Sequence, residues 1–300
     1  MRLTRRSTTV IVAAALIAAG VAAPAVASGG DDDRGGGSSS GDRLDAVGLS
    51  NAGKTLVAFR TTDARDARKV GDVTLDVDTS LVGIDYRAQD GKLYGVGDEG
   101  GIYVLDAKKA GATRVGRLTV ALEGAHFGVD FNPAANALRI TGDTGQNLRQ
   151  PFGTTTPDVP DEATVADGRL TNPATPPATA LVPAGGVTAA AYTNNDLDAD
   201  TATVLHDLDT AVDQLAIQSP ANAGTLAPVG KLGADAGPDA GFDIYSTVRD
   251  GRSVAAQGWA TLTVGGKSRI YSVNLTTGQA SDRGTFRMPV TDLAIGLDQH

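Results

Sequence analysis

The stretch HFGVDFNP, residues 126–133, carries the pattern that decides the fold: a glycine, an apolar residue, an aspartate and a large apolar residue. The same pattern occurs at residues 83–86 and 241–244, and a degenerate copy lies at 186–192. We expect a fifth copy at residues 290–297. Units that recur every ~40 to 60 residues, each with several short strands, are typical of propeller blades.

Short strand-like runs follow each copy of the pattern. Residues 92–96, 101–106 and 114–118 follow the copy at 83–86, and glycine-containing turns separate them. Strands of this length, punctuated by tight turns, favour an all-β chain. The sequence therefore predicts a β-propeller of about five blades, each with four short antiparallel strands.

The first blade lacks an inner strand at its start, because the domain begins with only three strand-like runs, at residues 44–49, 55–59 and 68–72. We expect the C-terminal strand to complete this blade, since a closed ring leaves no exposed sheet edge. A sixth blade is the alternative, if the proline-rich stretch 151–183 contains a distorted one. The few strand formers in that stretch favour a long surface excursion instead.

The N-terminus reads as an export signal followed by a tether. Residues 1–27 combine a basic start, an Ala-rich apolar run and a small-residue cleavage site before Ser28, which predicts a signal peptide. A retained membrane anchor is the alternative, and the Arg5-Arg6 pair leaves Sec and twin-arginine export both open. Residues 28–42 form a Gly/Ser/Asp linker predicted to be disordered, and residues 43–300 the propeller domain. We expect a secreted or cell-wall-associated protein with no membrane span once the signal is removed.

The charge and cysteine content limit the partners. The formal net charge is −9, and it becomes −12 without residues 1–27, which contain three arginines and no acid. An acidic surface repels phosphate backbones, so we exclude nucleic acid as a partner. The chain has no cysteine, which excludes disulfides, thiolate nucleophiles and cysteine-held metals. We expect a monomer that binds a small molecule, a glycan or a cell-wall component.

Several segments resemble one known family, DUF4394. They are residues 128–133, 138–139, 143–149, 189–194 and 274–278. The resemblance extends over roughly residues 44–297, and the Asp-Thr-Gly-Gln-Asn-Leu-Arg string at 143–149 is its most specific part. It implies a secreted bacterial domain of unknown function with propeller-like repeats. It implies no activity.

Four aspartates are candidate metal ligands because the repeat places them on inner strands, which approach the central channel. They are Asp85, Asp130, Asp243 and Asp292. Carboxylates gathered around one axis repel each other unless a cation or hydrogen-bond donors satisfy them, and Ca²⁺ prefers oxygen ligands. The alternative is that each aspartate accepts backbone N–H groups and joins neighbouring blades.

A second candidate site follows the opening stretch, where polar side chains are densest. The candidate ligand-binding residues are Asp130, Asn132, Arg139, Asp143, Gln146, Asn147 and Arg149. Arginine and amide side chains bind carboxylates or sugars in a fixed geometry. The alternative is an Asp-Thr-Gly turn whose side chains cap their own loop.

Other motifs are weaker. Residues 95–100 match a dinucleotide-binding fingerprint, but a strand follows where that motif requires a helix, so we predict a hairpin turn. The alternating aspartates at 196, 198 and 200 lack the glycine of a calcium-binding loop and are interpreted as an acidic loop. Of the three histidines, His126 is the best catalytic candidate, because it precedes an inner strand near a channel mouth.

These observations favour a secreted ligand-binding or scaffold module of unknown ligand. The alternative is a metal-assisted hydrolase, similar to a lactonase, that uses the channel aspartates with Ca²⁺. A third reading is a cell-wall protein that binds through its acidic surface. Whether the protein is an enzyme stays open at this point, and no cofactor other than Ca²⁺ is suggested.

Overall fold

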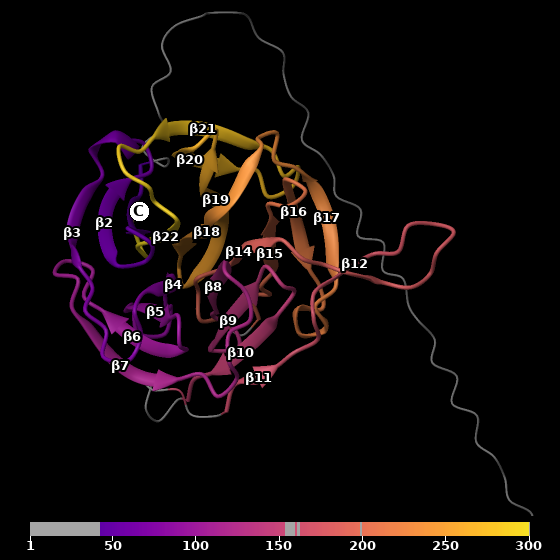
Figure 1. Ribbon diagram of the computed structural model, residues 1–300, viewed down its shortest axis with the longest axis horizontal. Helices are drawn as coiled ribbons and strands as arrows, with labels where there is room; N and C mark the ends of the chain where they lie inside the picture. Colours follow the sequence, from indigo (N-terminus) through magenta and orange to yellow (C-terminus); the bar gives the residue numbers. More distant parts are fainter. Residues whose placement is uncertain (1–42, 154–159, 161–162, 199, 300) are drawn as a thin grey trace, which may run out of the picture. The chain divides into compact units, whose positions relative to one another are not determined.

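Five four-stranded antiparallel sheets form a ring in the computed structural model, as the repeats predict. The structure describes residues 43–153, 160, 163–198 and 200–299. The predicted signal peptide and linker, residues 1–42, lie outside this range. The strands β4, β8, β14, β18 and β22 lie innermost (Figure 1). The chain is therefore a five-bladed β-propeller, and the alternative of six blades is wrong.

The blades are described from the inner strand outward. Blade 1 contains β22 (Asp292–Ile295), β1 (Asp45–Ser50), β2 (Thr55–Arg60) and β3 (Arg68–Asp72). Blade 2 contains β4 (Leu81–Tyr86), β5 (Leu93–Gly97), β6 (Gly101–Leu105) and β7 (Ala112–Arg117). Blade 3 contains β8 (Phe127–Asn132), β9 (Ala137–Gly142), β10 (Asn147–Pro151) and β11 (Val165–Ala166). Blade 4 contains β14 (Val187–Tyr192), β15 (Leu205–Asp209), β16 (Gln214–Gln218) and β17 (Leu226–Lys231). Blade 5 contains β18 (Ala236–Arg249), β19 (Arg252–Val264), β20 (Lys267–Val273) and β21 (Ala280–Thr285).

The ring closes in blade 1, where the C-terminal strand β22 pairs with the first strand β1. This confirms the expected closure. Among the described residues the helical turns are two 3₁₀ turns, η2 (Ala64–Asp66) and η3 (Ala221–Ala223). None of the helices in the described part of the chain is long and apolar enough to cross a membrane.

The proline-rich stretch does two things. Its middle supplies the short fourth strand of blade 3, β11, and its end forms a separate two-stranded sheet of β12 (Thr171–Asn172) and β13 (Val182–Pro183). The chain between β12 and β13 projects outward from the ring (Figure 1). The stretch is therefore partly a surface excursion, as expected, and partly the outer edge of a blade.

The repeat pattern has a packing explanation. A Cβ atom on Gly128 would lie 2.4 Å from the backbone nitrogen of Ala190 in blade 4, and one on Gly241 would lie 2.4 Å from Cα of Asp292 in blade 1. No side chain fits at such a distance, so glycine lets adjacent inner strands approach closely. The aspartate two residues later points to the same side of the strand and therefore also faces the next blade.

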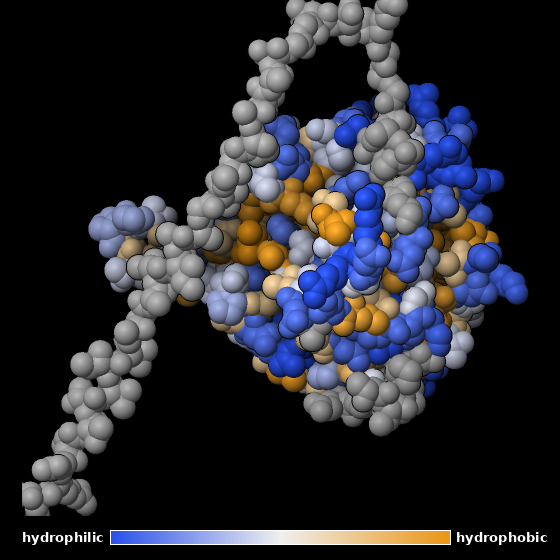
Figure 2. Space-filling model, turned by 180° about the vertical axis from the view of Figure 1, so that it is seen from behind, coloured by the Kyte–Doolittle hydropathy of each residue, from blue (hydrophilic) through white to orange (hydrophobic). Residues whose placement is uncertain are grey.

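Apolar side chains fill the spaces between the blades. Phe242 and Ile244 of β18 pack with alanines of β14, and Tyr94 of blade 2 packs edge-on against Phe131 of blade 3. Hydrophilic residues predominate on the face seen in Figure 2, with smaller apolar patches between them. The core therefore lies between blades, and the polar residues buried in it need individual explanations.

Candidate functional site

Three of the four predicted channel aspartates converge. Asp85, Asp130 and Asp243 are buried, and one carboxylate oxygen of each lies within 4.8 Å of those of the other two. Three oxygen ligands at such spacing are a plausible set for a hard cation, so this triad could hold a metal.

Each triad aspartate is also bonded to the next blade. Asp85 Oδ2 accepts the backbone N–H of Phe131 at 2.7 Å, and Asp130 Oδ1 accepts that of Tyr192 at 3.0 Å. Asp243 Oδ2 accepts the N–H of Ile295 at 2.6 Å, across the closure of the ring. The aspartates therefore join neighbouring blades, which was the alternative to metal binding, and the same geometry brings them together.

The expectation that Asp292 occupies the equivalent position is wrong. In blade 3, Asp130 of the inner strand lies opposite Arg139 of the next strand. The corresponding pair in blade 1 is Ala294 and Val47. Asp292 lies two residues nearer the start of its strand than Ala294. Asp292 thus takes the place of the repeat's glycine. It still links blades, because its Oδ2 accepts the backbone N–H of Ile84 at 2.8 Å. Ala191 fills the aspartate position in blade 4.

Burial makes these carboxyl groups weak acids. It is the main cause that raises the pKa of Asp85 and of Asp130 well above the usual value, and the neighbouring triad carboxylates add to it. Burial also raises the pKa of Asp243 to about 6 and that of Asp292 well above its usual value. These shifts favour the protonated forms of the triad, and a cation would have to displace those protons.

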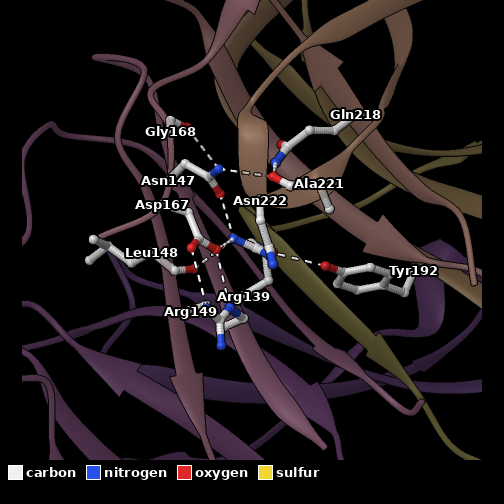
Figure 3. Close-up of polar contacts among 10 residues, drawn as sticks. All are labelled: Arg139, Asn147, Leu148, Arg149, Asp167, Gly168, Tyr192, Gln218, Ala221 and Asn222. Atoms are coloured by element: carbon white, nitrogen blue, oxygen red, sulfur yellow. Dashed lines mark hydrogen bonds and ion pairs between the residues drawn. The ribbon is translucent and has the colours of Figure 1, made fainter. Parts of the chain in front are cut away.

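The second predicted cluster is an internal network centred on Arg139, which is 2% exposed (Figure 3). Its Nη1 donates to Asp167 and to Asn147, both at 2.7 Å, and its Nη2 donates to Asn222 at 2.7 Å. Its Nε donates to the hydroxyl of Tyr192 at 3.3 Å. Because Tyr192 and Asn222 belong to blade 4, this network fastens blade 3 to blade 4.

The other predicted ligand-binding residues have similar internal partners. Arg149 donates to Asp167 at 3.2 Å, and the Asn147 amide donates to the carbonyls of Gly168 and Ala221. Gln146 bonds to the backbone of Glu123 and Ala121. Asn132 Oδ1 accepts the N–H groups of the turn that follows it, at residues 134 and 135. A ligand at these residues would have to replace bonds within the fold, so their ligand-binding role stays a prediction.

Asp143 differs, because it lies at the top of the ring, which we define as the end where the five inner strands begin. Its Oδ2 lies 3.0 Å from Nδ1 of His126, and the other ring nitrogen, Nε2, lies 3.4 Å from Oδ1 of Asp239. All three side chains are partly exposed. His126 thus lies at a channel mouth, as expected.

Two hollows meet at this end. The first, of about 240 Å³, is lined by residues of all five blades, including Ser80, His126, Thr188, Asp239 and Thr291; we call it the mouth hollow. The second, of about 430 Å³, is lined by Asp143 and Thr210 and shares Thr188 and Pro238 with the first. A larger open hollow of about 850 Å³ lies elsewhere, beside blade 1 around Phe59 and Met288.

Sequence reasoning missed Asp167, Asp239 and Asp207. Asp167 lies in the proline-rich stretch, where nothing marks it. Asp239 lies two residues before Gly241, and His126 lies two residues before Gly128. The repeat could therefore have shown that Asp239 and His126 occupy equivalent positions at the start of inner strands. Asp207, on β15, is fully buried, and neither of its oxygens has a hydrogen-bond partner among the described residues. Burial raises its pKa to about 8.

The weaker motifs are structural. The glycine-rich residues 97–100 form the turn between β5 and β6, so the hairpin prediction is confirmed. In the acidic loop, Asp196 Oδ2 accepts the backbone N–H of Ser253 at 2.6 Å, and Asp198 pairs with Arg252. These contacts hold the loop against the β18–β19 hairpin.

Fold and site together define a five-bladed β-propeller with a buried acidic channel and a small hollow at one mouth. The chain belongs to the DUF4394 family, described as a domain of unknown function, whose model matches residues 55–294. The resemblance seen in the sequence is thereby confirmed. No curated protein matches the chain.

Solved structures are similar to this chain at low sequence identity. A nidogen/laminin complex chain is 11% identical, with a TM-score of 0.44, over 86% of this chain and 87% of that one. A Bacteroides fragilis protein proposed to be a 6-phosphogluconolactonase is 12% identical, with a TM-score of 0.42, over 85% of each chain. A Bacteroides thetaiotaomicron protein of unknown function is 12% identical, with a TM-score of 0.43, over 85% of this chain and 67% of that one.

Proposed function

We propose that the protein is an exported ligand-binding module that holds a small molecule in the mouth hollow. The observation that carries this proposal is that all five blades contribute to one partly open hollow at the channel mouth. Ligand sites in proteins are typically concave and combine apolar walls with a few convergent polar groups. Here Leu49, Leu81 and Phe127 supply apolar walls beside Ser80 and His126.

The test is to fill the hollow and to follow binding. A panel of small molecules, sugars and cell-wall fragments is screened by melting temperature and by protein-detected NMR. Thr291→Phe places a ring in the mouth hollow, and Val254→Phe places the same ring on an exposed residue of β19 as a matched control. We expect a ligand whose binding is lost in Thr291→Phe and kept in Val254→Phe. Binding that survives Thr291→Phe unchanged would place the site elsewhere.

Export is part of the proposal and rests on the sequence of residues 1–27. Expression in a bacterial host with the full N-terminus should release protein that begins at Ser28. Mass spectrometry of the protein recovered outside the cells measures this directly. Protein that stays with the membrane at full length would support the retained anchor instead.

A metal-assisted hydrolase is a second candidate, because the carboxylates of Asp85, Asp130 and Asp243 converge. On this proposal the three carboxylates would hold Ca²⁺, which would supply Lewis-acid polarisation of a substrate carbonyl group or a water molecule. Both oxygens of Asp85 already accept backbone N–H groups, which leaves fewer lone pairs for a cation.

Native mass spectrometry of protein purified with Ca²⁺ separates the two candidates. One bound ion, together with turnover of simple esters or lactones that a chelator abolishes, would support the hydrolase. Asp130→Asn should then remove turnover while the melting temperature stays close to that of the parent. The exposed substitution Asp250→Asn is the matched control. A protein without bound metal counts against this candidate.

A further inference from the structure

His126 is held between two carboxylates at the mouth hollow. Asp143 is fixed in place, because it also accepts the backbone N–H groups of Ala125 and His126. A carboxylate only accepts hydrogen bonds, so Nδ1 of His126 donates to Asp143. The opposite ring nitrogen, Nε2, then faces Asp239 across 3.4 Å.

This contact crosses the mouth. His126 belongs to blade 3 and Asp239 to blade 5, and blade 4 separates the two in the ring. Among the described residues, His126 is the one ion-pair partner of Asp239, whose side chain is 55% exposed. One side of the Asp239 carboxylate is therefore open to a ligand.

The carboxylates of Asp143 and Asp239 line the two hollows at this end. Neither hollow is lined by a lysine or arginine among the described residues. Lys267 and Arg287 line a neighbouring hollow that shares Asp239 and Thr291 with the mouth hollow. The carboxyl group of Asp292 and the triad are buried in the channel between the inner strands. Among the described residues, the imidazole between Asp143 and Asp239 is thus the one basic side chain that lines these two hollows.

We propose that the mouth hollow takes a small organic cation, with an ammonium group against Asp239, and that the His126 ring competes for the same carboxylate. This inference rests on the proposed ligand site. An ammonium group near Asp239 is attracted by that carboxylate, and an anion is repelled. Loss of the His126 ring removes the internal competitor, so the cation should then bind more tightly.

The experiment compares a charged probe with a neutral probe of the same shape. Choline and 3,3-dimethylbutan-1-ol are titrated into the full mature protein. Affinity is measured by calorimetry and by NMR shifts of mouth residues. We expect choline to bind at least about tenfold more tightly than the alcohol.

Two variants assign the effect to residues. Asp239→Asn should weaken choline binding by about tenfold or more and leave the alcohol unchanged. His126→Gln removes the ring that faces Asp239, so it should strengthen choline binding and keep the preference for the cation. Asp250→Asn, on an exposed turn, controls for the general loss of one negative charge.

The outcomes separate this inference from the proposed function. Equal binding of the two probes, or a preference for acetate over both, overturns the cation inference. A neutral ligand from the wider panel that binds in a Thr291-dependent way would then keep the mouth as the site. If no probe and no panel member shifts any mouth resonance, both proposals fail.

Discussion

Asp207 provides the sharpest prediction about stability, because this acidic group lies in the protein interior without a hydrogen-bond partner among the described residues. It lies on β15 between Ala190 and Ala216 of the adjacent strands, it is 0% exposed, and its oxygens have no hydrogen-bond partner among the described residues. The contact of Gly128 with Ala190 shows that this face of blade 4 lies against blade 3. Asp207→Asn keeps the shape of the side chain and removes its ionisation.

The pKa of Asp207 sets the size of the expected change in the free energy of unfolding. Burial raises the pKa of Asp207 from 3.8 to about 8, so the folded state favours the protonated form. The stability linked to this proton is complete below about pH 4, falls as pH rises, and is lost as pH passes about 8. At pH 7 the cost relative to acid pH is about 4 kcal/mol as an upper estimate, since one pKa unit corresponds to about 1.4 kcal/mol. For a domain of this size, that free-energy cost corresponds to a melting temperature lower by about 10 °C.

The assay is thermal and urea unfolding of parent and Asp207→Asn between about pH 4 and pH 8. Near pH 4 the two proteins should unfold at similar temperatures, because the parent carboxyl group is then neutral. Toward pH 8 the variant should become the more stable one. Asp250→Asn, on an exposed turn, should follow the parent at every pH. Parallel curves for parent and Asp207→Asn would refute the reasoning and imply that Asp207 has a compensating partner.

Two further predictions concern the joints between blades. Arg139→Met should reduce the free energy of unfolding by about 3 to 5 kcal/mol, because it leaves Asp167 buried with only the longer contact to Arg149; urea unfolding measures this. Arg169→Met, which breaks an exposed pair with Glu123 and an exposed hydrogen bond to the Thr144 carbonyl, should cost less than about 1 kcal/mol, and equal losses would contradict the assigned role. Gly128→Ala should lower the melting temperature markedly, because its Cβ would lie 2.4 Å from the Ala190 nitrogen. Gly111→Ala, with its nearest contact at 3.8 Å, should be nearly neutral, and the reverse order would show that the inner strands can separate.

The blades were predictable because their signals are local. Apolar runs and turns placed the strands of blade 1 at residues 44–49, 55–59 and 68–72, and the structure has them at 45–50, 55–60 and 68–72. Blade 3 was harder, because its fourth strand is two residues long and lies within a proline-rich stretch. A strand of that length has no periodicity to detect.

The candidate site was only partly predictable, because its contacts join distant residues. The sequence pointed to Arg139 and Asn147, but their partners Asp167 and Asn222 come from other segments and make the cluster internal. Asp292 looked equivalent to Asp130, and only the pairing of β22 with β1 shows that it is offset by two residues. Nothing in the local pattern fixes such a register.

The sequence by itself determined the repeat and the expected closure of the ring, because glycine, apolar residue and aspartate each meet a local requirement of an inner strand. It left five and six blades open, and the structure decided for five. The tertiary structure decided which polar groups meet. It brought Asp85, Asp130 and Asp243 together and placed His126 opposite Asp239 across the mouth. It also buried Arg139 between two blades, where its guanidinium donates to internal partners. Those encounters depend on the curvature of the ring, which no short stretch of sequence encodes.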